Sequence, residues 1–334
     1  MSSRPTRSVD GTQGGAATAS PHSTTHQPHF AGNSAAHRAA IGAAERYASF
    51  EHVTVLIEGE SGTGKSYVAR HLHLSSPRAR GPYHQVILST LDDNLAASDL
   101  FGHLSGSYTD ARQNRPGHFV TANGGTLLLD EIGKASPAVQ RKLLHAIEHQ
   151  EIWPVGADRA VRLNVRLVAA SNIPLTALVE DGHFLDDLAA RLTNFCVRLP
   201  SLRERREDIP PLVRQFVASR APMCGYPARA PRIDDELMAA LRCADWPYNL
   251  RQLDGVVQRL LMEADGAELI TMAHCTKELR RMIGCDEIAL TPAMVQERMA
   301  ELKSVAAAAQ SLGVSRWTIY RYLERAERAQ ACAS

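Results

Sequence analysis

The chain has 334 residues, of which 44% are apolar, so it is long enough for two or three domains with a buried core. Its formal net charge of +1 excludes a general attraction to nucleic acid, and any DNA contact must come from a local patch. No segment approaches the roughly 18 apolar residues that a membrane span needs. The six cysteines show no CxxC spacing, which predicts reduced thiols in a cytoplasmic protein with no membrane contact.

The first part of the chain contains little that a core could bury. Residues 1–27 are rich in Ser, Thr, Gly and Ala, a composition typical of a disordered tail, and no N-terminal sensor domain is expected. A helix-compatible pattern covers His37–Phe50, and the β-branched run Val53–Ile57 predicts a buried strand. Glycines then lead into a second helix near Lys65.

Two further apolar runs predict buried strands. Thr126–Leu129 ends in an acidic pair, and Val165–Ala170 ends in Ser171–Asn172. Between them, Ser136–Pro137 is typical of a helix start, with serine as the cap and proline in the first turn. Strands that alternate with helices predict an α/β fold over residues 28–200, with a parallel sheet covered by helices on both faces.

After Pro200 the strand signals stop. The patterns of Leu202–Arg220, Ile233–Cys243 and Asn249–Ala264 predict three helices, which we expect to form a helical lid over residues 201–268. A less regular stretch, residues 269–290, is expected to be a linker.

The segment between the first strand and the second helix matches the phosphate-binding pattern GxxxxGK[ST] in full. The residues of this loop are Gly59, Glu60, Ser61, Gly62, Thr63, Gly64, Lys65 and Ser66. The glycines allow backbone N–H groups to surround phosphates, and the helix N-terminus adds partial positive charge. Lys65 would neutralise the β- and γ-phosphates, and the Ser66 hydroxyl would reach Mg²⁺. The flanking strand and helix favour an ATP site over a chance glycine-rich turn.

The acidic pair Asp130–Glu131 supplies the second half of such a site. A carboxylate at the end of a buried strand can hold the Mg²⁺ shell, and its neighbour can polarise an attacking water. We assign Asp130 to the metal and Glu131 to the water. Without the upstream loop the pair would be read as a solvated strand end.

Residues 291–334 have the pattern of helix, tight turn and helix, over Ser304–Gln310, Ser311–Ser315 and Arg316–Glu324. Four arginines and two glutamates give the stretch 304–330 a local charge of +2. The second helix would present polar residues that can contact bases or phosphates: Ser315, Arg316, Trp317, Thr318, Tyr320 and Arg321. From spacing alone, a helical hairpin packed on the lid is an equal alternative.

From about residue 32 to its end, the chain resembles a known family, the AAA+ bacterial enhancer-binding proteins that activate transcription by sigma-54 RNA polymerase. The combination is specific, because no other AAA+ group has these segments in this order. The segments are VLIEGESGTGKS, DLFGHLSGSYTDA, RPGHFVTANGGTLLLDEIGKASPAVQRKLLHAIE, RLVAASN, RLPSLRERREDIP and DWPYNLRQL. The stretch SLGVSRWTIYRYL is similar to the Fis-type helix-turn-helix of this family, which favours DNA binding by a homodimer.

The resemblance implies roles for three further residues. Asn172 matches the sensor of the γ-phosphate, and Arg251 matches the lid arginine that reaches back to the nucleotide. We expect Asn249 to cap the helix that carries Arg251. Arg191 matches an arginine offered to the ATP of the neighbouring subunit, where it would stabilise charge on the transferred phosphoryl group.

The resemblance also implies a contact with sigma-54 through the loop Gly106–Ala111, in which Tyr108 and Thr109 keep the family's aromatic–threonine pair. Asp110 replaces a glycine there, which adds a charge and restricts the backbone.

Three more positions depart from the family. Leu185 stands in place of a second intersubunit arginine, Ile87 in place of a polar asparagine, and Tyr248 in place of a glycine. The groups that bind ATP are therefore complete, whereas groups that tune hydrolysis are partly replaced.

The leading hypothesis is a DNA-bound ATPase that assembles from dimers towards a hexameric ring and remodels sigma-54 polymerase, regulated by expression level or by a protein partner. The alternative is a DNA-binding regulator or repressor that uses nucleotide to set its oligomeric state and hydrolyses ATP weakly. A metabolic P-loop kinase is disfavoured because no substrate domain is recognisable.

Overall fold

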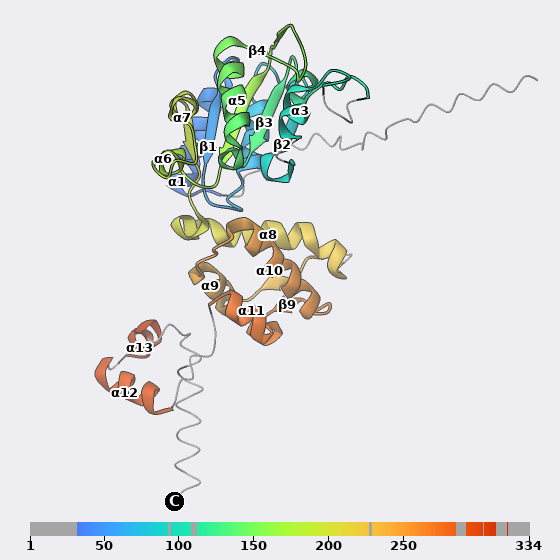
Figure 1. Cartoon of the computed structure of the whole chain (residues 1–334). Helices are drawn as coiled ribbons and strands as arrows, with labels where there is room; N and C mark the ends of the chain where they lie inside the picture. Colours follow the sequence, from blue (N-terminus) through green and yellow to red (C-terminus); the bar gives the residue numbers. More distant parts are fainter. Residues whose placement is uncertain are drawn as a thin grey trace, which may run out of the picture.

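The chain folds into an α/β part that is followed by a helical part (Figure 1). This computed structural model describes residues 32–92, 95–107, 112–226, 229–284, 292–302, 304–311 and 319. No helix among the described residues is long and apolar enough to cross a bilayer.

A five-stranded parallel sheet lies at the centre of the α/β part, in the order β2-β3-β6-β1-β7. Its strands are β1 (Val55–Glu58), β2 (Tyr83–Ile87), β3 (Thr126–Asp130), β6 (Arg166–Ser171) and β7 (Cys196–Arg198). The three strands predicted from apolar runs are confirmed as β1, β3 and β6, each fully buried. Two strands, β2 and β7, were not predicted.

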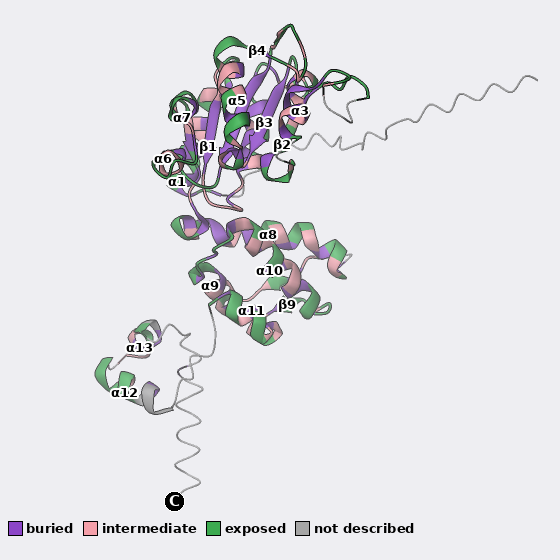
Figure 2. Ribbon diagram, in the orientation of Figure 1, coloured by how far each residue is buried: buried purple, intermediate pink, exposed green. Residues whose placement is uncertain are grey.

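Successive side chains of each strand enter two different cores, so the sheet is covered on both faces as predicted. Val55 and Ile57 pack with α1 (Ala35–Ala48) and α2 (Lys65–Leu74), whereas Leu56 packs with α5 (Pro137–His149) and α7 (Asp186–Thr193). Figure 2 shows the strands as the buried centre of this sandwich. The helices of the α/β part are α1 (Ala35–Ala48), α2 (Lys65–Leu74), α3 (Ala96–Phe101), α4 (His118–Thr121), α5 (Pro137–His149), α6 (Leu175–Glu180) and α7 (Asp186–Thr193). A short antiparallel pair, β4 (Glu151–Ile152) and β5 (Val161–Arg162), and the 3-10 turns η1 (Leu88–Thr90) and η2 (Ile132–Lys134) complete it.

The register of the sheet brings the carboxyl ends of its strands together on one side of the α/β part. Ile87 at the end of β2 pairs with Asp130 at the end of β3, and Glu58 at the end of β1 pairs with Ser171 at the end of β6. The loops that leave this side carry the predicted site residues, as expected for an open parallel sheet.

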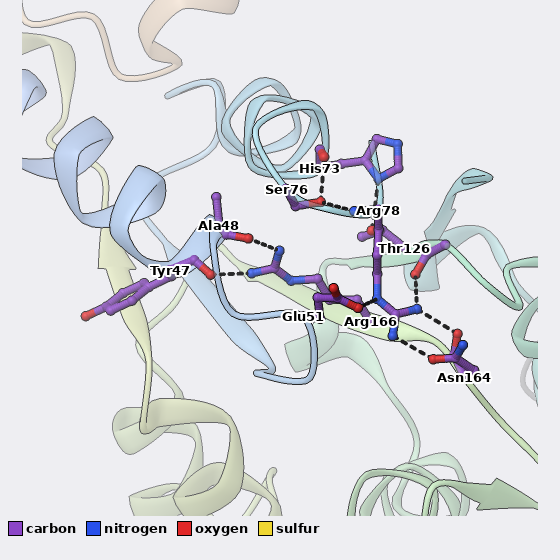
Figure 3. Close-up of polar contacts among 10 residues, drawn as sticks. Tyr47, Ala48, Glu51, His73, Ser76, Arg78, Thr126, Asn164 and Arg166 are labelled. Atoms are coloured by element: carbon purple, nitrogen blue, oxygen red, sulfur yellow. Dashed lines mark hydrogen bonds and ion pairs between the residues drawn. The ribbon is translucent and has the colours of Figure 1, made fainter. Parts of the chain in front are cut away.

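At the amino ends of the strands, two buried arginines hold the sheet to the neighbouring segments (Figure 3). Arg166 donates to the carbonyl oxygens of Ala48 (2.9 Å) and Tyr47 (2.6 Å). Arg78 donates to the carbonyl and side-chain oxygens of Asn164, at 2.8 and 2.6 Å. Burial, with Arg78 nearby, lowers the pKa of Arg166 to about 10. This cluster joins α1, α2 and β6 on the side remote from the strand ends that carry the site.

The helical part has its own core, centred on the fully buried Trp246, whose Nε1 donates to the carbonyl of Leu241 (2.8 Å). Its elements are η3 (Leu202–Asp208), α8 (Ile209–Arg220), η4 (Ala221–Cys224), β8 (Arg232–Ile233), α9 (Asp235–Cys243), α10 (Asn249–Glu263), β9 (Leu269–Ile270), η5 (Met272–His274) and α11 (Lys277–Met282). The helix predicted over Leu202–Arg220 is divided, because the backbone leaves helical geometry at Arg205 (φ −130°, ψ 46°).

Residues 269–284 differ from the linker expected there. Ile270, Cys275, Leu279 and Ile283 are buried in the core of the helical part, so this stretch belongs to the lid. Beyond it, α12 (Pro292–Leu302) and α13 (Val305–Ser311) pack around a small cluster of their own, formed by Val295, Ala309 and Ile319.

Candidate nucleotide-binding site

The phosphate loop lies between β1 and α2, as predicted from the sequence, and its shape requires glycine. Gly62 and Gly64 have φ values of +78° and +104°, which side-chain-bearing residues rarely adopt. A Cβ at Gly62 would lie 2.2 Å from the carbonyl oxygen of Tyr248, so the lid backbone also touches the loop here. Tyr248 itself has φ −109°, a conformation open to any residue, which explains why glycine is dispensable at that position.

Lys65 is the first residue of α2, and its ammonium lies within the loop. Its Nζ donates to the carbonyl oxygens of Gly59 (2.7 Å) and Glu60 (2.9 Å). Burial lowers the pKa of Lys65, and the carboxylates of Asp130 and Glu131 oppose this shift. The ammonium of Lys65 is therefore close to both carboxylates of the acidic pair.

Ser66 and Asp130 meet at the strand edge. The Ser66 hydroxyl donates to Oδ2 of Asp130 at 2.9 Å, and the backbone N–H of Glu131 donates to Oδ1 at 3.0 Å. A hydroxyl and a carboxylate so close together form the hard oxygen donor set that Mg²⁺ prefers. The residues present therefore fit the metal predicted for this site. Glu131 follows with φ 57°, in the left-handed region where functional residues often hold strain.

A third residue contacts the same carboxylate and was not predicted from the sequence. Gln85 on β2 donates from Nε2 to Oδ2 of Asp130 at 3.0 Å. Ile87, the position noted as lacking a polar side chain, lies two residues further along β2 and pairs in register with Asp130. The sequence signal that could have identified Gln85 is its spacing of two residues from Ile87, since residues two apart on a strand lie on the same face.

The lid is joined to the phosphate loop by Asn249. Its Oδ1 accepts from the N–H of Leu202 (2.6 Å), and its Nδ2 donates to the carbonyl of Ser61 (2.9 Å) and to Oε2 of Glu60 (3.2 Å). The expectation that Asn249 caps α10 is wrong: the cap position is Tyr248, without a side-chain cap bond. Asn249 is fully buried, so its amide is used between the lid and the loop instead.

Two arginines of the lid also reach the loop. Arg251, in the first turn of α10, donates from Nη1 to the hydroxyl of Ser61 at 3.3 Å. Arg203 forms a paired contact with the carboxylate of Glu60 and lowers the pKa of that carboxyl. The structure therefore places Arg251 beside the predicted nucleotide site.

A buried network on η3 provides a second attachment of the lid. Arg205 donates to the carbonyl of Thr63 (3.0 Å) and contacts Nδ1 of His37 (2.7 Å). Asp208 accepts from the hydroxyl of Ser34 (2.6 Å) and from its N–H (2.7 Å). Burial, followed by the charge of Arg205, lowers the pKa of His37, and the charge of Asp208 opposes this shift.

The other predicted site residues lie apart from this cluster. Asn172 is exposed directly after the end of β6, at the same strand edge. Arg191 on α7 is paired with Glu148 and lines an open cavity with Thr54 and Phe195, which precede β1 and β7. It therefore lies towards the amino ends of the strands, away from the phosphate loop of its own subunit.

The remaining candidate residues fall outside the described part of the chain. They are Tyr108, Thr109, Ser315, Arg316, Trp317, Thr318, Tyr320 and Arg321.

The fold and the site together define a P-loop nucleoside triphosphatase module of the AAA+ type. Its defining features are the glycine loop with Lys65, the carboxylate of Asp130 beside Ser66, and a helical lid bonded to the loop.

Comparison with known proteins narrows this class. The sigma-54 interaction domain family matches residues 30–198, and the AAA+ ATPase lid domain family matches residues 203–287. The Nif-specific regulatory protein of Azospirillum brasilense is 41% identical over 227 residues, covering 68% of this chain and 36% of that protein. The transcriptional regulatory protein ZraR of Klebsiella oxytoca is 38% identical over 291 residues, covering 81% of this chain and 63% of that protein.

A solved structure is also similar. NtrX from Brucella abortus in complex with ATP superposes with a TM-score of 0.71 at 29% identity, covering 89% of this chain and 69% of that one. The chain belongs to the sigma-54 interaction domain family of AAA+ proteins. It spans between about one third and two thirds of the length of the curated relatives described here, at 36% and 63%.

Proposed function

We propose that this protein is an ATP-dependent, DNA-binding transcriptional activator that remodels sigma-54 RNA polymerase so that the open complex can form. The observation that carries the proposal is the contact between Ser66 and Asp130 beside Lys65, in a chain of the sigma-54 interaction domain family. This arrangement has the parts needed to hold Mg-ATP and to neutralise charge on its phosphates.

The proposed division of labour follows the geometry of these residues. The loop N–H groups and Lys65 bind the phosphates, and Ser66 with Asp130 holds Mg²⁺, which supplies charge neutralisation at the β- and γ-phosphate oxygens. Glu131 accepts a proton from the attacking water, and Asn172 at the same strand edge senses the γ-phosphate. Without its carboxylate at position 131, the site would bind ATP and fail to hydrolyse it.

Arg191 acts on the nucleotide of a neighbouring subunit in this proposal. Its place near the amino ends of β1 and β7, away from its own phosphate loop, supports a role between subunits. Hydrolysis would then need an oligomer, from a dimer towards a ring, whereas ATP binding by Lys65 and Arg251 would not. The transferred phosphoryl group gains charge stabilisation from such an arginine.

The coupling to transcription is assigned to two segments that lie partly outside the described residues. Tyr108 and Thr109 in the loop Gly106–Ala111 would contact sigma-54 and pass the movement of the ATPase to it. Residues 291–334 would bind an upstream DNA site as a dimer, through the second helix of the helix-turn-helix. Regulation would come from a protein partner or from the amount of this protein in the cytoplasm.

A second candidate function is a nucleotide-controlled DNA-binding regulator that hydrolyses ATP weakly. It is favoured by Leu185, whose side chain packs against the core of the α/β part and cannot serve as an intersubunit arginine. Ile87 offers no polar group beside Asp130. Both candidates bind ATP and DNA, so they differ in turnover and in sigma-54 activation.

Three purified forms of the chain separate these candidates: the wild type, Lys65→Ala and Glu131→Gln. We expect the wild type to hydrolyse Mg-ATP with a specific activity that rises with protein concentration. Lys65→Ala should lose ATP binding, whereas Glu131→Gln should bind ATP and release no phosphate. Tight ATP binding with no wild-type turnover at any protein concentration would favour the second candidate.

A further inference from the structure

The carboxylate of Asp130, a residue that is only 9% exposed, accepts three hydrogen bonds. Its Oδ1 accepts one bond, from the N–H of Glu131. Its Oδ2 accepts two, from the Ser66 hydroxyl at 2.9 Å and from Nε2 of Gln85 at 3.0 Å. Ser66 and Gln85 therefore donate to the same carboxylate oxygen.

Gln85 reaches this oxygen from the edge of the sheet. It lies on β2, the outermost strand, and its strand neighbour in register is Leu128, two residues before Asp130. Its side chain must therefore extend along the strand direction to reach the carboxylate. Ile87, which is directly opposite Asp130, has no side-chain group that can donate.

A second donor matters because the torsion that turns a carboxylate about its Cβ–Cγ bond is soft. Without Gln85, each oxygen would keep a single donor, Ser66 on Oδ2 and the N–H of Glu131 on Oδ1, and the carboxylate could still tilt about the line that joins these two contacts. With a second donor on Oδ2 and a third on Oδ1, the plane of the group is set and Oδ2 stays beside the Ser66 hydroxyl. Partners of this kind, one step removed from a metal, commonly change metal affinity by about 10- to 100-fold.

We propose that Gln85 is a positioning residue for Mg²⁺: its amide fixes the orientation of the Asp130 carboxylate beside the Ser66 hydroxyl, the pair that would hold the metal. The proposal rests on the proposed function, since it requires that Mg-ATP binds at Ser66 and Asp130. It adds a residue of β2 to the metal side of the site.

The test uses Gln85→Met, which keeps the length of the side chain and removes the amide. His84→Met is the matched control, because it introduces the same residue at the neighbouring position of β2, whose side chain lies on the other face of the sheet. Both changes are placed in the full chain carrying Glu131→Gln, so that ATP binding is measured without hydrolysis. Binding of ATP is followed by calorimetry, first in EDTA and then over a series of Mg²⁺ concentrations.

We expect Gln85→Met to raise the Mg²⁺ concentration that half-saturates the gain in ATP affinity by about tenfold. ATP affinity in EDTA should stay within about twofold of the parent, because no phosphate contact is removed. In the chain with Glu131 intact, kcat at saturating Mg²⁺ should change by less than about threefold. His84→Met should leave the Mg²⁺ series unchanged.

Coincident Mg²⁺ series for Gln85→Met and its parent would overturn the proposal, and so would an equal loss of ATP affinity in EDTA, which would indicate a structural role. If Gln85→Met does not fold, as judged by its circular dichroism spectrum, Gln85→Ala takes its place with the same expectations. A parent chain that binds no ATP, or whose ATP affinity does not depend on Mg²⁺, would instead contradict the proposed function itself.

Discussion

Arg191 and Glu148 form an ion pair between α7 and the last turn of α5, in which Nη2 lies 3.1 Å and Nε 3.2 Å from the same carboxylate oxygen. The arginine side chain is 58% exposed and lines an open cavity of about 560 Å³. The group proposed to act on a neighbouring subunit is thus held by its own subunit, in a position that a second subunit can approach.

Replacement of Glu148 tests whether this pair restrains the arginine. An exposed ion pair contributes about 0.2–1 kcal/mol, so Glu148→Gln should raise ATP turnover at a fixed protein concentration by up to about fivefold. Arg191→Ala should lower turnover on the order of 10³-fold. Steady-state phosphate release measures both effects.

The double variant distinguishes release of Arg191 from an unrelated effect of the substitution. In the Arg191→Ala background, Glu148→Gln should change nothing, because the restrained group is absent. An equal gain in both backgrounds would show that Glu148 acts through another residue.

The contact between Asn249 and the phosphate loop predicts that its loss lowers ATP affinity. Asn249→Asp keeps the oxygen that accepts from Leu202 and removes the Nδ2 bonds to Ser61 and Glu60. It also tolerates the positive φ of 50° at this position. The new carboxylate would be fully buried beside that of Glu60, so we expect ATP affinity to fall by roughly tenfold or more and the free energy of unfolding to fall by about 3 kcal/mol.

Calorimetric titration with ATP and urea unfolding measure these two quantities. Asn249→Ala is the comparison, since it removes the same Nδ2 bonds without adding a charge. It also leaves the N–H of Leu202 without its acceptor and should cost about 2 kcal/mol in stability. Unchanged ATP affinity in Asn249→Asp would mean that the lid contact does not support nucleotide binding.

The sequence was informative where burial is complete. β1, β3 and β6 each contain a continuous apolar run because both of their faces are covered, and such runs stand out. The glycine loop, the acidic pair and the alternation with helices then located the strand edge where the site lies. The placement of Lys65, Ser66 and Asp130 could therefore be predicted before any coordinates.

The sequence was less informative at the sheet edges and between the parts of the chain. β2 mixes buried Val86 with exposed or half-buried residues, so it has no continuous apolar signal, and Gln85 on it was missed. The role of Asn249 depends on residues 188 and 47 positions away, Ser61 and Leu202, which local capping rules cannot detect. Arg205 interrupts a helical pattern because its side chain bonds to the distant Thr63.

The buried arginines at the amino ends of the strands should affect stability without affecting the nucleotide. Arg78→Met removes the charge-assisted bonds to Asn164 and should lower the free energy of unfolding by about 2 kcal/mol. Arg80→Met, two residues away and exposed, should change it by less than about 0.5 kcal/mol. ATP affinity of both variants should match the wild type, and a selective loss in Arg78→Met would link this cluster to the site.

His37 predicts how stability depends on pH. Its pKa in the folded protein is lowered from 6.5, mainly by burial and then by Arg205, so the unfolded chain binds a proton more readily. The stability that neutral His37 provides is present above 6.5 and is lost as the pH falls from there towards the folded pKa. Urea unfolding at about pH 8 and about pH 5.5 measures this loss.

His37→Gln keeps an acceptor for Arg205 and cannot gain a proton. Its loss of unfolding free energy between these two pH values should be smaller than that of the wild type, by up to about 1 kcal/mol. A residual loss is expected, because burial also lowers the pKa of His73 and His118. Equal losses in the two proteins would exclude His37 as a contributor.

The most direct measurement is open-complex formation by the purified chain with sigma-54 RNA polymerase on a promoter that carries its binding site. Permanganate reactivity of the melted strand reports the result. We expect melting with the wild type and ATP, and none with Glu131→Gln, with Lys65→Ala or without nucleotide. A wild-type chain that hydrolyses ATP and binds the DNA, yet melts no promoter, would contradict the proposed function.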